Sequence, residues 1–219
     1  DRLMEAGDVT VDDEIAQPGR MITGKEKIKV RDQIIRSQDR KVVVAYYKPV
    51  GVTVTKSDPH ARVTLEDVFR YPIHLTYAGR LDRDSEGLLL MTNDGELIDA
   101  MMRSSNEHEK EYIVRTRGKL SDEDLHQMSK GIWLKDLEVK TKPSRIERLG
   151  DYTFPIVLTQ GLNRQIRRMC KARGHEVKTL KRVRVLNITV KGLQPGMQRE
   201  LTQDERMKLY EMVGLTLAD

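Results

Sequence analysis

The chain has 219 residues, of which 38% are hydrophobic and 33% charged, and this apolar content supports a folded core rather than wholesale disorder. The net charge is +5, and no apolar run is long enough for a membrane-spanning helix. The single cysteine, Cys170, excludes a disulfide framework and favours a reducing, cytoplasmic location.

The first forty residues predict a small unit that precedes the main domain. Residues 3–7 are typical of the last turn of a helix that ends at a glycine. Strands are expected at 9–11 and 27–31, where short β-prone runs are bounded by turn residues. Residues 32–40 are polar and offer few apolar anchors, so we expect a linker there.

The remainder of the chain mixes strands and helices in an irregular order. Helical crossovers between strands are too few for a doubly wound parallel sheet, which favours the α+β class. The expected strands lie at 42–46, 88–92, 112–114, 138–139, 156–158 and 183–190, and the expected helices at 64–69, 95–103, 121–131, 163–173 and 202–212.

Positive charge is concentrated in the segment 163–184. The segment contains one acidic residue, Glu176, and a run of this kind attracts phosphate groups. A basic surface that only contacts solvent is the simpler alternative. Aromatic residues make up only 5% of the chain, so a stacking platform for single strands is not obvious. The basic residues of the segment are Arg164, Arg167, Arg168, Lys171, Arg173, Lys178, Lys181, Arg182 and Arg184.

Motifs for nucleotide, dinucleotide and metal binding are absent from the sequence. Neither common glycine-rich phosphate loop occurs, and the five histidines do not have metal-ligand spacings. The segment 82–87 imitates the start of a calcium loop, but Asn93 stands where such a loop needs a bidentate glutamate. We therefore expect neither a metal nor a cofactor.

Three short segments combine residue types that suit chemistry. In 79–90, Asp82 lies on a charged turn just before a core strand, where a carboxylate can be held and partly desolvated. The segment 108–114 carries Tyr112, which could equally be an ordinary strand aromatic. The segment 160–170 brings guanidinium groups to the start of a helix, a good site for phosphate.

Taken in order, these motifs resemble the bacterial ribosomal RNA pseudouridine synthases. The resemblance covers about residues 42–212, and residues 3–31 resemble the later part of the alpha-L RNA-binding module that precedes such domains. It implies a mixed, largely antiparallel sheet flanked by helices, with the partial module and linker at 1–37 and the catalytic domain at 41–219. The motifs are Gly79–Asp82, Lys110–Tyr112 and Asn163–Met169, together with Lys48–Gly51 and Leu89–Leu97.

The resemblance also implies a reaction and the residues that carry it. Uridine in RNA would be isomerised to pseudouridine without a cofactor, with Asp82 as the catalytic carboxylate. Attack on the sugar C1′ and elimination through a glycal are both open for this residue. Tyr112 would stack on the uracil and act as a general base, and Arg167 would pair with Asp82.

Further residues are expected to bind the RNA. Leu158 and Ile166 would wall the uracil pocket, although a core role fits them equally. Arg80 would fill the space that the extruded base leaves, or would simply pair with Asp84. The remaining expected RNA contacts are Arg164, Arg168, Lys171, Lys178, Lys181 and Arg182.

Structured RNA is thus the expected partner, and a monomer is expected. The stretches 106–109 and 160–169 favour 23S ribosomal RNA, with 16S ribosomal RNA and tRNA as alternatives. Two other functions fit the residues less well. A non-catalytic RNA-binding or ribosome-assembly protein would not need Asp82, Tyr112 and Arg167 together, and an RNA glycosylase would call for a second placed carboxylate.

Overall fold

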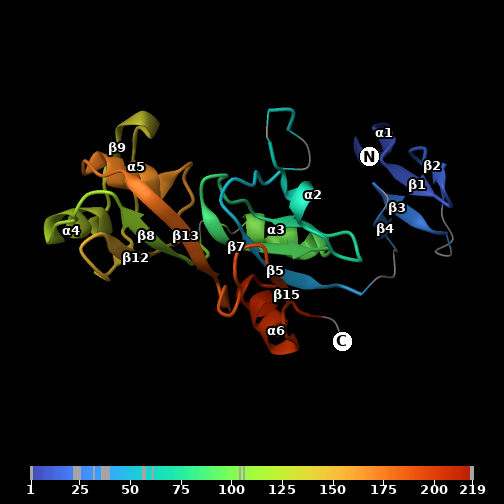
Figure 1. The fold of residues 1–219 in the computed structure, drawn as a ribbon. Helices are drawn as coiled ribbons and strands as arrows, with labels where there is room; N and C mark the ends of the chain where they lie inside the picture. Colours follow the sequence, from blue (N-terminus) through green and yellow to red (C-terminus); the bar gives the residue numbers. More distant parts are fainter. Residues whose placement is uncertain are drawn as a thin grey trace.

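The computed structural model describes residues 2–21, 26–31, 33–35, 40–55, 58–60, 62–103, 105 and 107–217. Within them the chain forms a small N-terminal sheet at one end of the molecule and a large sheet that carries most of the helices (Figure 1). The small sheet has the strand order β2-β1-β3-β4 and is preceded by the short helix α1, Arg2–Glu5. Its strands are β1 (Val9–Val11), β2 (Glu14–Ile15), β3 (Ile28–Val30) and β4 (Gln33–Ile35).

Strand β4 corrects the interpretation of residues 32–40 as a linker. Gln33–Ile35 pair antiparallel with β3, whereas residues 32 and 36–39 lie outside the described part of the chain. Three residues are too few to show an alternation of apolar and polar side chains, so the sequence does not reveal this strand. Its pairing with the backbone of β3 stabilises it. The small sheet also reaches the main domain, because Arg31 pairs with Glu66 as well as with Asp8.

The large sheet has nine strands, and all of its pairings are antiparallel except that of β13 with β7. This confirms the α+β class with a mixed, largely antiparallel sheet. The main order is β11-β12-β8-β13-β7-β5-β15, with β6 beside β7 and β14 beside β13. The strands are β5 (Val43–Lys48), β6 (Thr76–Ala78), β7 (Glu86–Thr92), β8 (Lys110–Thr116), β11 (Arg145–Ile146), β12 (Thr153–Leu158), β13 (Val177–Val185), β14 (Ile188–Thr189) and β15 (Gln198–Glu200).

The single strand expected at 183–190 is in fact two strands. Leu186 adopts a left-handed conformation (φ 54°), and the chain turns there from β13 into the antiparallel β14. Leucine is not a turn-forming residue, so the run of β-prone residues hid this reversal.

Helices cover both faces of the large sheet. Alternate side chains of β5 point to opposite faces, so its odd-numbered residues pack with α3 and α6 and its even-numbered residues with α2. Helices α4 and α5 cover the other half of the sheet, formed by β8, β12 and β13. The helices are α2 (Leu65–Val68), α3 (Gly95–Arg103), α4 (Asp122–Lys130), α5 (Gln165–Ala172) and α6 (Gln203–Met212).

The two halves of the sheet meet where β13 runs beside β7. This parallel pairing spans only Lys181 with Glu86 and Arg182 with Gly87. Gly87 has φ +113°, and an added Cβ would lie 2.2 Å from the carbonyl oxygen of Arg182, so no other residue fits there without a shift. The strands separate beyond this contact, and a cavity lies beside it.

Candidate active site

A cavity of about 680 Å³ lies at the junction of the two halves of the sheet. Its volume is in the range of sites that bind small ligands, and it is large enough to receive a nucleotide. One wall comes from the turn between β6 and β7 and the other from β8, β12, β13 and the start of α5. The lining includes Gly79, Arg80, Leu81, Asp82 and Ser85 on the first wall, and Lys110, Tyr112, Leu158, Arg164, Gln165, Ile166 and Leu180 on the second.

Asp82 lies at the lip of this cavity, next to the buried Leu81. Its side chain is 44% exposed, so a substrate can reach the carboxylate. The turn that carries Asp82 is fixed by its backbone. The amide of Ser85 donates to the carbonyl of Asp82 (3.1 Å), and the amide of Gly51 donates to the carbonyl of Arg83 (2.7 Å).

Lys48 supports the same turn from inside the domain. Its fully buried ammonium donates to the carbonyls of Val52 (2.9 Å) and Arg83 (3.3 Å), and to that of Pro49. Burial lowers the pKa of Lys48 to about 8, against the attraction of nearby carboxylates. The segment Lys48–Gly51, which belongs to the family resemblance, thus acts here as a support for the Asp82 turn.

Arg164 bridges the two walls of the cavity. It adopts a left-handed conformation (φ 50°) just before α5, which turns its side chain across to the Asp82 turn. Its Nη1 lies 3.4 Å from Asp82 Oδ2, and its guanidinium donates two hydrogen bonds to the carboxylate of Asp84 (3.0 and 2.7 Å). The hydrogen bonds from Arg164 lower the pKa of Asp84 below its usual value. The carboxylates of Asp82 and Asp84 therefore share one arginine.

The position of Arg167 differs from the expected pairing with Asp82. Its Nη2 donates to the carbonyl of Asp84 (3.0 Å) and to Ser85 Oγ (3.3 Å), and its Nε lies 3.6 Å from Asp84 Oδ2. The helix begins at Gln165. Arg167 therefore contacts the backbone of the Asp82 turn, whereas Arg164 contacts its carboxylates. The partner of each arginine depends on which residue begins the helix.

Tyr112, Leu158 and Ile166 all line the cavity, as the resemblance implied. Leu158 and Ile166 are buried, and both also belong to the core cluster beneath α5, so the pocket and core roles coincide. Tyr112 is partly buried and packs against the cores of both halves of the sheet. Tyr112 and Asp82 thus line the same cavity at the junction of the two halves.

Lys110 and Asp84 are site residues that the sequence reasoning did not assign. The ammonium of Lys110 donates to the carbonyls of Ser105 (2.8 Å) and Thr159 (2.9 Å), and burial lowers its pKa to about 8. Two residues before Tyr112 on the same strand, Lys110 must share its face. The two-residue spacing from Tyr112 could have identified Lys110 as a residue of the site. In the same way, the two-residue spacing from Asp82 could have identified Asp84.

The expected RNA contacts divide into two groups. Arg80 and Arg182 line the cavity with Arg164, but Arg182 is buried and its guanidinium donates to the carbonyls of Leu88 (2.9 Å) and Arg80 (3.1 Å). These two bonds tie β13 to β7 and to the segment before Asp82, and the expected contact of Arg182 with RNA stays a prediction.

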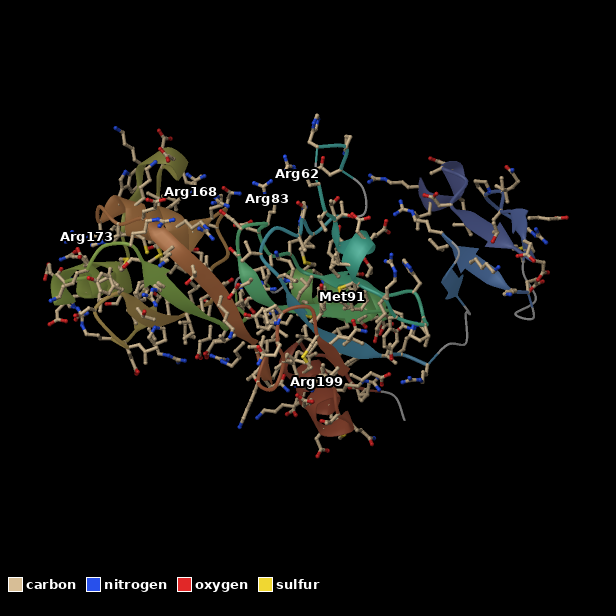
Figure 2. All side chains as sticks on the ribbon, in the orientation of Figure 1. Arg62, Arg83, Met91, Arg168, Arg173 and Arg199 are labelled. Atoms are coloured by element: carbon tan, nitrogen blue, oxygen red, sulfur yellow. The ribbon has the colours of Figure 1, made fainter. Side chains whose placement is uncertain are left out.

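The other expected contacts lie outside the cavity. Arg168 donates to Asn163 and pairs with Asp136 (3.2 Å), while Lys171 and Lys178 are exposed. The Lys181 ammonium lies 5.2 Å from the centre of the Tyr47 ring, on the face opposite Arg182. Figure 2 shows Arg62, Arg83 and Arg168 along the upper side of the view, across both halves of the sheet.

Across the described ranges, no three His, Cys, Asp or Glu side chains are grouped so that they could hold a metal ion. Among the helices in the same ranges, none is both long and apolar enough to cross a membrane.

Comparison with known proteins agrees with this geometry. Residues 42–172 match the family model described as RNA pseudouridylate synthase. The chain is 36% identical to the dual-specificity RNA pseudouridine synthase RluF of Escherichia coli K12, over 97% of this chain and 73% of that protein. It is also 36% identical to the ribosomal large subunit pseudouridine synthase B of the same organism, over 97% of this chain and 77% of that protein.

A solved structure gives the same result for the fold. A crystal structure of a pseudouridylate synthase superposes with a TM-score of 0.71 and 28% identity, and the match covers 95% of this chain and 91% of the other. The family model covers more than half of the chain, and the relatives match it almost from end to end. From both observations it follows that the chain belongs to the RNA pseudouridine synthase family.

Proposed function

We propose that the protein isomerises uridine to pseudouridine in 23S ribosomal RNA, with Asp82 as its catalytic residue. The main support for this proposal is the position of Asp82 in the structure. Its accessible carboxylate lines the same cavity as Tyr112, and it is held by a turn whose backbone carbonyls accept hydrogen bonds from Lys48 and Arg167. Such a carboxylate is fixed before the substrate arrives, as catalysis requires.

The reaction must break one bond, keep both fragments and form another bond between them. The N1–C1′ bond of uridine breaks, the uracil turns, and a C5–C1′ bond forms. The C5 hydrogen leaves as a proton and N1 gains one. Asp82 serves this sequence either by attacking C1′ or by starting elimination through a glycal. Arg164, at 3.4 Å, orients the carboxylate in both routes.

The walls of the cavity suit retention of the uracil. Leu81, Leu158 and Ile166 are buried apolar residues, and they exclude water that would otherwise capture the sugar. The Tyr112 ring supplies a surface for the uracil, and its phenol serves as the general base. Arg80, exposed at the same rim, fills the space that the extruded base leaves in the RNA.

The choice of RNA is supported by the relatives and by the distribution of charge. One relative is named for the large ribosomal subunit, and another is named as a dual-specificity enzyme. Exposed lysines beyond the cavity, Lys171 and Lys178, suit contacts with the backbone of a large folded RNA. The N-terminal unit, residues 1–37, would dock the RNA separately from the catalytic domain at 41–219, and the enzyme would act as a monomer in the cytoplasm.

Tritium release from RNA labelled at uridine C5 tests the proposal. Formation of the C5–C1′ bond displaces this hydrogen, so the assay reports the isomerisation wherever it occurs. We expect release from unmodified 23S transcripts in preference to 16S transcripts and total tRNA. Preferential release from tRNA or 16S would contradict the substrate, and free uracil would indicate a glycosylase. RNA binding without release would indicate a non-catalytic RNA-binding protein.

A further inference from the structure

Trp133, the only tryptophan of the chain, points away from the protein. It lies on a short hairpin formed by β9 (Trp133–Leu134) and β10 (Val139–Lys140), which the 3₁₀ helix Lys135–Leu137 connects. Leu134 and Val139 are paired across the hairpin and pack into the core beneath α5. Trp133 and Lys140 form the next pair, so they share the outer face.

The exposure of Trp133 is unusual for its chemistry. The indole is 57% exposed although its neighbour Leu134 is buried. Covering a large aromatic side chain is favourable, and tryptophan is enriched where a partner covers it. The inner face of the hairpin packs into the core, and its outer face holds the indole in solvent. This arrangement indicates that the outer face binds a partner.

The surroundings of Trp133 carry positive charge. Lysines precede it, follow it and pair with it across the hairpin, and Lys171 is exposed on the neighbouring α5. Two acids share the hairpin, Asp136 and Glu138, but Asp136 is paired with Arg168 (3.2 Å). The lysines of this surface are Lys130, Lys135, Lys140 and Lys142.

The hairpin is also connected to the active site through α5. Strand β9 packs against this helix, and the Arg168–Asp136 pair fixes the two together. Arg164, at the start of the same helix, contacts Asp82. Lys171 follows Arg164 by two helical turns, about 10 Å along the axis. Helix α5 thus links the Asp82 turn, which Arg164 contacts, to strand β9, which holds Trp133.

We propose that Trp133 and Lys140 bind the substrate RNA outside the catalytic cavity. The indole stacks on an unpaired base, and Lys140 contacts an adjacent phosphate. This inference rests on the proposed function, because it requires that RNA enters the cavity. Every base offers a flat face for stacking, so the surface contributes affinity and orientation without reading the sequence.

The fluorescence of the protein provides a direct test, because all tryptophan emission comes from Trp133. Titration of the full chain with unmodified 23S transcript is expected to quench this emission along with binding. Trp133→Ala should raise Kd and KM about fivefold or more, with a larger effect on KM than on kcat, and Trp133→Phe should recover part of the loss. Lys140→Ala should weaken binding and reduce its salt dependence.

Tyr152→Ala serves as the matched control, since Tyr152 is another exposed aromatic (42%), placed just before β12. Its removal should leave binding unchanged. Emission that does not change while filter binding shows a complex would overturn the proposal, as would a Kd for Trp133→Ala equal to that of the control. Because binding and emission are measured apart from turnover, a failure of the proposed isomerisation would appear separately, as absent tritium release.

Discussion

Asp82 and Asp84 illustrate how two like residues on one turn take different tasks. Among the described residues, the Asp82 carboxylate pairs with Arg164 at 3.4 Å, and it lines the cavity. Asp84 receives two shorter bonds from Arg164 and also lies beside Arg167. Asp84 therefore holds the two arginines more closely than Asp82 does, as the proposed catalytic role of Asp82 requires.

Replacement of Asp84 by Asn should damage catalysis without preventing binding. The Arg167 side chain is only 16% exposed, and loss of the neighbouring carboxylate would leave this charge poorly paired. We expect kcat to fall about tenfold, with a smaller change in KM and a lower Tm, because misplacement of Arg164 weakens the orientation of Asp82. Tritium release and thermal unfolding measure the two effects. Unchanged kcat would contradict the positioning role, and Asp84→Glu should recover part of the rate.

Tyr112 allows stacking to be separated from proton transfer. In the part of the chain that the structure describes, its hydroxyl has no hydrogen-bond partner, so Tyr112→Phe removes the phenol without leaving a buried group unpaired. We expect kcat to fall about a hundredfold or more if the phenol is the base, while KM changes little because the ring is kept. Tyr112→Leu should raise KM as well. A Phe variant of full activity would show that the ring alone matters.

Asp124 connects two helices and makes this connection sensitive to acid. It lies in the first turn of α4, yet it accepts hydrogen bonds from Arg173 (3.1 Å) and His175 (2.7 Å), which follow α5. Burial acts to raise the pKa of Asp124, but hydrogen bonds from Ser121, His175 and Arg173 outweigh it and lower this pKa to about 2. The carboxylate thus stabilises the fold in its ionised form.

The sign of the pH effect follows from this lowered pKa. The stabilisation is complete above the unfolded-state pKa near 4 and is lost as the pH falls toward 2. We expect Asp124→Asn to lower the free energy of unfolding by about 2 kcal/mol at pH 7, and the difference from wild type to shrink toward pH 2. Urea unfolding across this range measures it. Asp122→Asn, at an exposed position on the same helix, is the control. A difference that does not depend on pH would contradict the account.

The sequence predicted most elements because their signals are local. Capping boxes start α4 at Ser121 and α6 at Thr202, as their sequences indicated. Tertiary contacts decided the exceptions. Gln33–Ile35 became a strand through pairing with β3, and the partners of Arg164 and Arg167 follow from the left-handed residue that precedes α5. The exposure of Trp133 could not be predicted from the low aromatic content either, because composition does not show whether a given side chain is buried or exposed.

At the scale of the whole molecule, the positive charge is spread beyond the cavity. Exposed lysines on α5 and β13 lie on the half of the sheet opposite the N-terminal unit (Figure 1). An RNA bound to the N-terminal unit and to these lysines would cross the cavity between them. Phosphate contacts of this kind release counterions and make binding dependent on salt.

Lys171→Ala tests whether this charge binds RNA or only faces solvent. If Lys171 contacts one phosphate, the slope of log Kd against log salt should fall by about 0.7 to 0.9. Lys208→Ala, an exposed lysine on α6, should leave the slope unchanged. Filter binding across a salt series gives both values. Equal slopes for Lys171→Ala and wild type would identify the basic segment as a solvated surface.

Asp82→Asn tests most directly whether the Asp82 carboxylate carries the chemistry. The change keeps the size of the side chain and removes only its charge. Tritium release should be abolished, while RNA affinity should be kept or slightly raised because a negative charge is lost. A variant that retains about a tenth of the wild-type rate would have lost only about 1.4 kcal/mol of transition-state stabilisation, and this result would contradict the claim.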